Sequence, residues 1–197
     1  MADETPAMTR FPVPDPESLP EDLRERIEAE TERAGFTPNV FLAYGFRPAQ
    51  SRAFFAYYDA LVEEGALTRE EIEMIVVAVS GVNHCYYCNV AHGALLRIYS
   101  EKPELADQLV ANYRTAELSE RHRLMLDLAV ELTESPEEVE EEDLERLREA
   151  GFSDEEIWDV GSVTSFFNLS NRMAHLADMR PNREFHTMGY VSLNEGQ

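Results

Sequence analysis

The chain has 197 residues, 44% of them hydrophobic, which is enough to bury the core of one domain without disulfide bonds. Its formal net charge is −22, from 39 acidic and 17 basic residues. Such a surface repels nucleic acid and anionic lipid, so we expect neither nucleic acid nor a membrane as a partner. The first residues lack a basic start followed by an apolar run, and no apolar run reaches the roughly 18 residues of a membrane span, so we expect a soluble, cytoplasmic protein.

The acidic surface has two interpretations. Lys102 is the only lysine, and arginine supplies the other cations. An acid excess with almost no lysine is typical of proteins in a high-salt cytoplasm, where screening removes the self-repulsion. An arginine-biased genome gives the same composition, and the sequence leaves both interpretations open.

The first third of the chain predicts helices behind an extended arm. Residues 1–19 are rich in proline, which lacks an amide donor and fixes φ, so they predict an extended N-terminal arm. A helix with few apolar residues is expected over 20–34, followed by a short apolar turn over 40–44. Proline at 48 and glycine at 65 then mark the start and end of the next helix.

The middle of the chain predicts a buried helix followed by the helix that carries the cysteines. Thr68 and Glu71 form a capping box, and the apolar residues after them predict a largely buried helix to about residue 82. Asn83 is the expected N-cap of the next helix, which continues to Ile98.

The remainder also predicts helices, near 103–113, 119–132 and 140–150. Ser153 and Glu156 form a second capping box, and the helical region after it extends toward Arg180 with a break near Gly161. Trp158 is expected in the core. The fold class predicted is all-α, with one domain over 20–180 and a C-terminal tail over 181–197.

A weak internal repeat relates the two capped segments. Residues 67–72 resemble 152–157, and the Ala-His at 91–92 matches the Ala-His at 174–175. In this alignment Cys85 falls on Asn168 and Cys88 falls on Asn171. The interpretation is a duplicated helical unit with an active copy over about 67–100 and a degenerate copy over about 152–180; coincidence between short helical patterns is the alternative. Asn168 and Asn171 are candidates to line a pocket, and His175 is expected to be packed or at an interface.

The two cysteines of the chain, Cys85 and Cys88, share one expected helix face with His92 because they are spaced i, i+3, i+7. Unpaired amides and the helix dipole in the first turn favour a thiolate there. His92 can accept the proton. These are the components of a peroxidatic pair, in which one thiolate is oxidised by a peroxide to a sulfenic acid and the second thiol condenses with it to give a disulfide.

Glu73 lies on the preceding buried helix. If the two helices fold back on each other, its carboxylate approaches His92, orients the imidazole and raises its basicity. A surface carboxylate is the alternative. Two other interpretations of the cysteines remain open: a zinc half-site completed by His84 or His92, and a purely structural pair. A thioredoxin-type site needs a preceding strand, and none is predicted.

The order Glu73, Cys85-x-x-Cys88, His92 resembles the signature of the alkylhydroperoxidase D-like proteins of the carboxymuconolactone decarboxylase superfamily, in the branch of peroxidase-related proteins. The resemblance extends over about 38–180. It implies an alkylhydroperoxidase D-like helical bundle, a homo-oligomer (trimer or hexamer), and reduction of hydroperoxides with a dithiol or protein reductant, without a cofactor or metal. By motif position, Cys88 is the peroxide-attacking thiol, Cys85 the resolving thiol, and His92 with Glu73 the proton relay.

One position departs from the family pattern. The residue before the second cysteine is a histidine in the best-known members and is Tyr87 here; tyrosine is a poor base near neutral pH. Tyr87 and His84 are therefore auxiliary candidates, with His84 partly substituting for the missing histidine. The alternatives to a peroxidase are a decarboxylase acting on a lactone, which does not call for a redox dithiol, and a non-catalytic redox-sensing or assembly module on the same scaffold.

Overall fold

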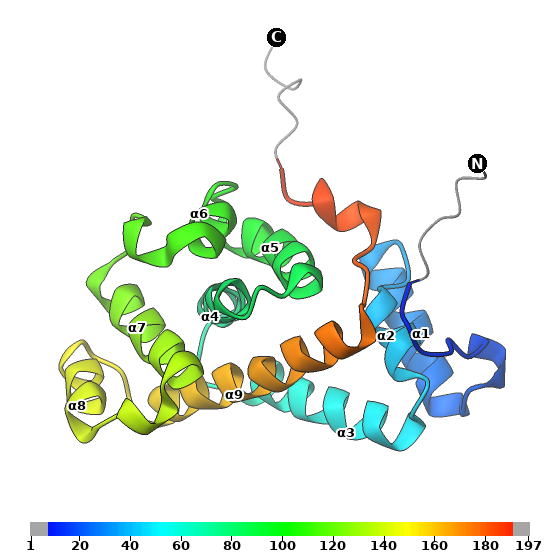
Figure 1. Ribbon diagram of the computed structural model, residues 1–197, viewed down its shortest axis with the longest axis horizontal. Helices are drawn as coiled ribbons and strands as arrows, with labels where there is room; N and C mark the ends of the chain where they lie inside the picture. Colours follow the sequence, from blue (N-terminus) through cyan, green and yellow to red (C-terminus); the bar gives the residue numbers. More distant parts are fainter. Residues whose placement is uncertain (1–7, 191–197) are drawn as a thin grey trace, which may run out of the picture.

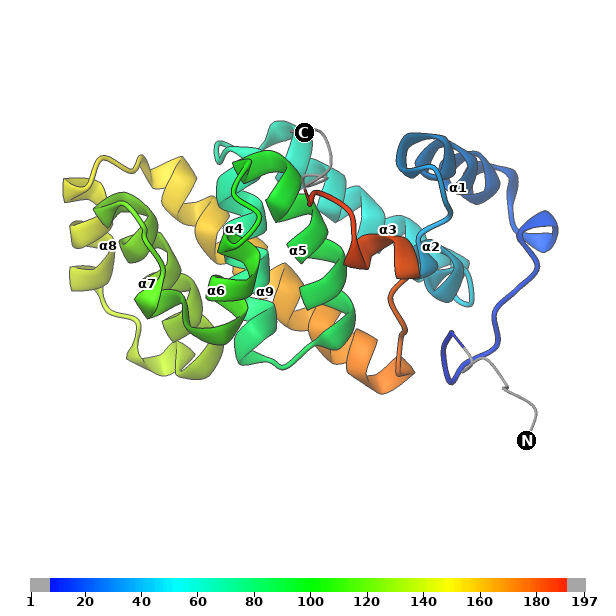
Figure 2. The ribbon, with the colours of Figure 1, turned by 90° about the horizontal axis from the view of Figure 1, so that it is seen from above.

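The computed structural model describes residues 8–190 and contains helices and turns, with no strand in this range, which confirms the predicted all-α class. Figures 1 and 2 show an elongated bundle with α8 near one end and α1 at the other. No helix within the described range is long and apolar enough to cross a membrane. The helices are α1 (Glu21–Ala34), α2 (Asn39–Tyr44), α3 (Pro48–Asp59), α4 (Arg69–Val82), α5 (Tyr86–Ser100), α6 (Leu105–Asn112), α7 (Glu120–Glu134), α8 (Glu141–Glu149) and α9 (Asp154–Ala177).

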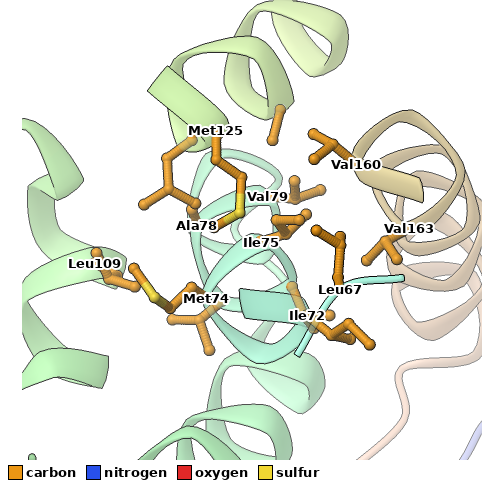
Figure 3. Packing of buried hydrophobic residues seen from close by; sticks show 14 of the residues in the cluster. Leu67, Ile72, Met74, Ile75, Ala78, Val79, Leu109, Met125, Val160 and Val163 are labelled. Carbon is orange, nitrogen blue, oxygen red and sulfur yellow. The ribbon is translucent and has the colours of Figure 1, made fainter. Parts of the chain in front are cut away.

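Helix α4 is the centre of the bundle. Figure 1 shows it end-on among α5, α6, α7 and α9, and it packs against all four. Its residues from Glu71 to Ser80 are all buried, which confirms the largely buried helix predicted here, and they include the carboxylates of Glu71 and Glu73. Gly81 allows the α6 backbone to come close, because a Cβ there would lie 3.1 Å from the Val110 carbonyl oxygen. Figure 3 shows the resulting packing: Met74 and Ala78 meet Leu109 and Met125, and Ile75 and Val79 meet Val160 and Val163.

Both predicted capping boxes form, at the start of α4 and at the start of α9. The expected N-cap role of Asn83 is wrong. Asn83 ends α4, and Cys85 is the N-cap of α5. The turn between the two helices passes through His84, whose φ of 54° lies in the left-handed region. This residue carries the reversal of direction that folds α5 back on α4.

Two expectations about α9 are also wrong. The helix is continuous from Asp154 to Ala177 and has no break at Gly161, because both of its halves pack against the same central helix. The second copy of the proposed repeat is therefore one helix rather than a helix-turn-helix. Trp158 is 76% exposed: the buried face of α9 includes Val160 and Val163, and a residue two positions before Val160 points to the opposite side.

The described parts of both end segments pack on the bundle. The Thr9 hydroxyl and the Arg10 amide donate to the Ala177 carbonyl at 3.0 and 2.7 Å. Arg97 of α5 donates to the carbonyl oxygens of Phe185 and Met188 at 2.8 and 2.9 Å. The expected arm contains a short 3₁₀ turn, Pro16–Ser18. The division into arm, domain and tail stays a prediction, and residues 1–7 and 191–197 lie outside the described range.

Candidate active site

The α4–α5 turn places both thiols at the start of α5. Cys85 caps the helix and Cys88 lies in its first turn. Both are free thiols, with exposed fractions of 1% and 2%. The amides of the first helical turn point toward this region and favour negative charge on sulfur. The local environment therefore combines a field that favours thiolates with burial that disfavours them.

Glu73 reaches the cysteine helix from α4. It is 0% exposed, and its Oε2 lies 2.7 Å from His92 Nδ1. Since a carboxylate accepts, Nδ1–H is the donor, and the neutral imidazole then has an unprotonated Nε2 available to take a proton. The other oxygen, Oε1, accepts from Arg69 Nη2 at 2.9 Å. Arg69 thus compensates the buried carboxylate, and Glu73 fixes the imidazole.

An aromatic pocket opens beside this pair. The cavity is about 280 Å³ in volume and is lined by Cys88 and His92, but not by Cys85. The His92 ring lies edge-to-face with Phe167, with ring centroids 4.8 Å apart. Cys88 is therefore the sulfur available to a molecule in the pocket. The aromatic wall of this pocket consists of Phe41, Phe54, Phe55, Tyr58, Tyr87, Tyr99, Phe166, Phe167 and Phe185.

A hydrogen bond between the two thiols moves their pKa values apart. A hydrogen bond from the Cys88 thiol lowers the pKa of Cys85 to about 7; the Cys88 backbone amide and the nearby His175 act in the same direction, and burial acts against them. The same hydrogen bond, together with burial, raises the pKa of Cys88 well above its usual value. The first ionisation thus belongs to the pair, with the negative charge on Cys85 and the proton between the sulfurs.

We expect the thiol pair to become reactive as the pH rises through about 7, because the thiolate is the nucleophile and its fraction grows above the pKa. Iodoacetamide alkylation followed by mass spectrometry should give this midpoint. His175→Asn should move the midpoint to higher pH, whereas the exposed His84→Asn should leave it unchanged. A wild-type midpoint near the free-cysteine value of about 8.5 would contradict the shared-proton arrangement.

The auxiliary candidates do not contact the relay. The Tyr87 hydroxyl accepts from the Val40 amide at 3.1 Å, and burial raises its pKa further above neutrality. Tyr87 thus joins α5 to α2 and is not a base. His84 is exposed, and its imidazole forms no hydrogen bond or ion pair with any other described residue; only its backbone amide is bonded, to the Gly81 carbonyl at 3.0 Å. Within residues 8–190, no group of three or more His, Cys, Asp or Glu side chains is placed to hold a metal ion.

Helix α9 contributes a polar network beside the cysteines, formed by residues that the sequence offered only as candidates to line a pocket. Asn83 Nδ2 donates to the side-chain oxygens of Asn168 and Asn171 at 2.9 and 3.0 Å. Asn171 in turn donates to the Ser80 hydroxyl at 3.0 Å, and its side chain acts to lower the pKa of Cys88. The exposed His175 donates from Nε2 to the Asn83 carbonyl at 2.8 Å.

These α9 residues hold the cysteine turn rather than line the aromatic pocket. Asn168, Asn171 and His175 are the residues that the repeat aligns with Cys85, Cys88 and His92. That alignment was the one available signal in the sequence, and it marks the segment that packs against the thiols.

The fold and site define a class: an all-helical protein with a buried dithiol beside a Glu–His pair. Comparison with protein families and solved structures identifies the family and supports the fold. The family model named carboxymuconolactone decarboxylase family matches residues 48–131. The chain therefore belongs to the carboxymuconolactone decarboxylase superfamily, among its alkylhydroperoxidase D-like, peroxidase-related proteins.

Two solved structures are similar over nearly their whole length. The alkylhydroperoxidase AhpD core of a peroxidase-related protein from Ralstonia eutropha JMP134 is 53% identical, with a TM-score of 0.93 over 95% of this chain and 99% of that one. A peroxidase-related protein from Silicibacter sp. TM1040 is 42% identical, with a TM-score of 0.89 over 96% and 100%. The debrominase Bmp8, 17% identical with a TM-score of 0.75 over 92% and 95%, shares the fold. Comparison with curated proteins gives no match.

Proposed function

We propose that the protein reduces organic hydroperoxides with its Cys85–Cys88 dithiol. The observation that carries this proposal is that Cys88 and His92 line one aromatic pocket. Glu73 accepts a hydrogen bond from His92 Nδ1 and so orients the imidazole. The site thus contains a nucleophile (Cys88), a base (His92) and a carboxylate that orients the base (Glu73), the groups that nucleophilic catalysis requires.

The reaction begins with proton transfer. One thiol proton of the pair passes to His92 Nε2, and the proton between the sulfurs moves to Cys85, which leaves the thiolate on Cys88. This thiolate attacks the terminal oxygen of a peroxide ROOH: the S–O bond forms, the O–O bond breaks, sulfur is oxidised by two electrons and the peroxide is reduced. The proton on His92 passes to the alkoxide, and the products are ROH and a Cys88 sulfenic acid.

The second half of the reaction restores the thiols. Cys85 attacks the sulfenic sulfur, the S–S bond forms, the S–O bond breaks, and the oxygen leaves as water with the Cys85 proton. An external dithiol or protein reductant then supplies two electrons by thiol–disulfide exchange. We place this cycle in the cytoplasm, where thiols are kept reduced, and in a homo-oligomer, a trimer or hexamer, as the family resemblance implies.

The decarboxylase-type reaction is the second enzymatic candidate, but the paired free thiols beside the pocket favour redox chemistry. A redox-sensing module on the same scaffold would form the disulfide without sustained turnover. Peroxide consumption over many turnovers, with a dithiol as reductant, separates these three functions: only the peroxidase sustains it.

A further inference from the structure

Arg69 is a cation at the first position of helix α4. The amides at a helix N-terminus favour acidic side chains and disfavour cations there. Helices α1, α7, α8 and α9 accordingly begin with Glu21, Glu120, Glu141 and Asp154. Arg69 Nε is also inaccessible to solvent and has no hydrogen-bond partner among the described residues. Both features cost free energy, which points to a role for this arginine beyond the stability of the helix.

The guanidinium of Arg69 is directed at the Glu73–His92 pair. Its Nη2 donates to Glu73 Oε1 at 2.9 Å, and the other carboxylate oxygen, Oε2, lies 2.7 Å from His92 Nδ1. The side chains of Glu73, His92 and Arg69 have exposed fractions of 0%, 15% and 22%. Arg69 does not line the aromatic pocket. It therefore acts on His92 through Glu73, in surroundings where water screens their charges little.

The proposed internal repeat gives a second indication. Residues 67–72 align with 152–157, so Arg69 falls on Asp154, and the next aligned position places Glu73 on Trp158. The copy without thiols thus lacks both the arginine and the carboxylate. In this alignment the Arg–Glu pair accompanies the cysteines.

Other titratable groups surround His92. They are Glu30, Arg33, Tyr58, Tyr87, Cys88 and Tyr99, which line the same pocket, and Cys85 and His175 at the cysteine turn. Arg33 already donates to Glu30 at 3.0 Å. Burial and the charge of Glu73 raise the pKa of Tyr58 to about 12, and burial raises the pKa of Tyr87 as well. The neighbour of the His92 ring on α9 is Phe167, which does not titrate. Arg69 is therefore the cation that bears on Glu73.

The net charge of this buried cluster depends on Arg69. With the arginine present, an ionised Glu73 and a neutral His92 make the cluster neutral, and a further proton would make it cationic. Without the arginine, the same two groups are anionic and become neutral only by binding a proton. Because an uncompensated buried charge is costly, the pair alone would bind that proton, on the imidazole as the more basic group.

We propose that Arg69 is a positioning residue that keeps the proton off His92 Nε2, so that the imidazole is free to accept the thiol proton. Its positive charge holds Glu73 ionised and opposes a second positive charge on His92. The catalytic consequence rests on the proposed peroxidase function. The place of the proton can be measured without any peroxide.

The test is nitrogen NMR of the His92 imidazole at neutral pH, with His92→Asn to assign the signal. Wild type should show Nε2 without a proton, and Arg69→Met should show the imidazolium. Arg69→Lys, which keeps the charge, should resemble wild type. A protonated Nε2 in the wild type would overturn the inference, even if Arg69→Met does not fold. A neutral imidazole in folded Arg69→Met would overturn it as well.

The pH profile of the peroxide step is the second readout. With cumene hydroperoxide, Arg69→Met should be about 10-fold slower than wild type at pH 6, as for a nearby charge that shifts a proton equilibrium by one pH unit. It should approach the wild-type rate at pH 9, where the imidazole loses its proton in both proteins. The same loss of rate at both pH values would mean that Arg69 acts through stability alone.

Arg121→Met is the matched control. Arg121 Nε donates to Glu71 Oε1, on the same helix, at 3.3 Å. This variant should lose stability but keep the wild-type NMR signal of His92 and the wild-type pH profile. If the NMR results are as expected and the wild type consumes no peroxide, the proposed function is wrong and the assignment of the proton stands.

Discussion

Replacing Cys88 with serine should reduce peroxide consumption to the level of a variant that lacks both thiols. Cys88 is the sulfur that lines the aromatic pocket together with His92, and a serine hydroxyl is far too weak a nucleophile to replace a thiolate there. Cys85→Ser should behave differently. Cys88 can still react once, so each chain should consume one equivalent of hydroperoxide and stop as a sulfenic acid.

The measurement is peroxide consumed per chain, with dimedone labelling and mass spectrometry to locate the oxidised sulfur. Label on Cys88 in the Cys85→Ser protein and none on Cys85 in the Cys88→Ser protein is the expected pattern. The reverse pattern would assign the attack to Cys85, the sulfur that carries the resting charge. The assignment is thus open to a direct contradiction from the same two variants.

Glu73→Gln should lower the rate of the peroxide step by about 10²–10⁴-fold, the usual contribution of general acid–base catalysis. The substitution keeps the shape of the side chain but removes the charge that orients His92 and makes it basic. It also leaves the Arg69 guanidinium without its charged partner. Breaking a buried ion pair from one side costs about 3–5 kcal/mol, so the free energy of unfolding should fall as well.

Glu71→Gln is the matched control for this loss of stability. Glu71 is a neighbouring buried carboxylate on α4, 5% exposed, and its partners are Thr68 and Arg121 rather than His92. This variant should unfold at lower urea concentration but retain the peroxide rate. Equal loss of activity in both variants would mean that Glu73 acts through stability alone and not on His92.

Local signals in the sequence were sufficient for the framework of the site. Both capping boxes were predicted from four-residue patterns, because the side chains and amides that form them are neighbours in the chain. The contact between Glu73 and His92 was predicted on the condition that the two helices fold back on each other, and α5 does pack on α4. The i, i+3, i+7 spacing predicted one helix face for Cys85, Cys88 and His92, but Cys85 caps the helix and does not line the pocket that Cys88 and His92 share. The dithiol chemistry stays a proposal.

Contacts between distant segments were not predictable in the same way. Trp158 was predicted to lie in the core because tryptophan is large and apolar. Whether its side chain is buried depends on which face of α9 packs against α4, and the sequence does not specify that face. Asparagine is a common N-cap residue, which is why Asn83 was predicted to cap the next helix. Its side-chain amide instead donates to Asn168 and Asn171, 85 and 88 residues away in the chain.

The most direct test of the account is peroxide consumption by the wild-type protein over many turnovers, with dithiothreitol as reductant and cumene hydroperoxide as substrate. The Cys85→Ser/Cys88→Ser variant, shown to be folded by its circular dichroism, is the control. The account predicts many equivalents of peroxide consumed per chain by the wild type and none above background by the variant. Equal consumption by the two proteins would contradict the central claim that this dithiol reduces hydroperoxides.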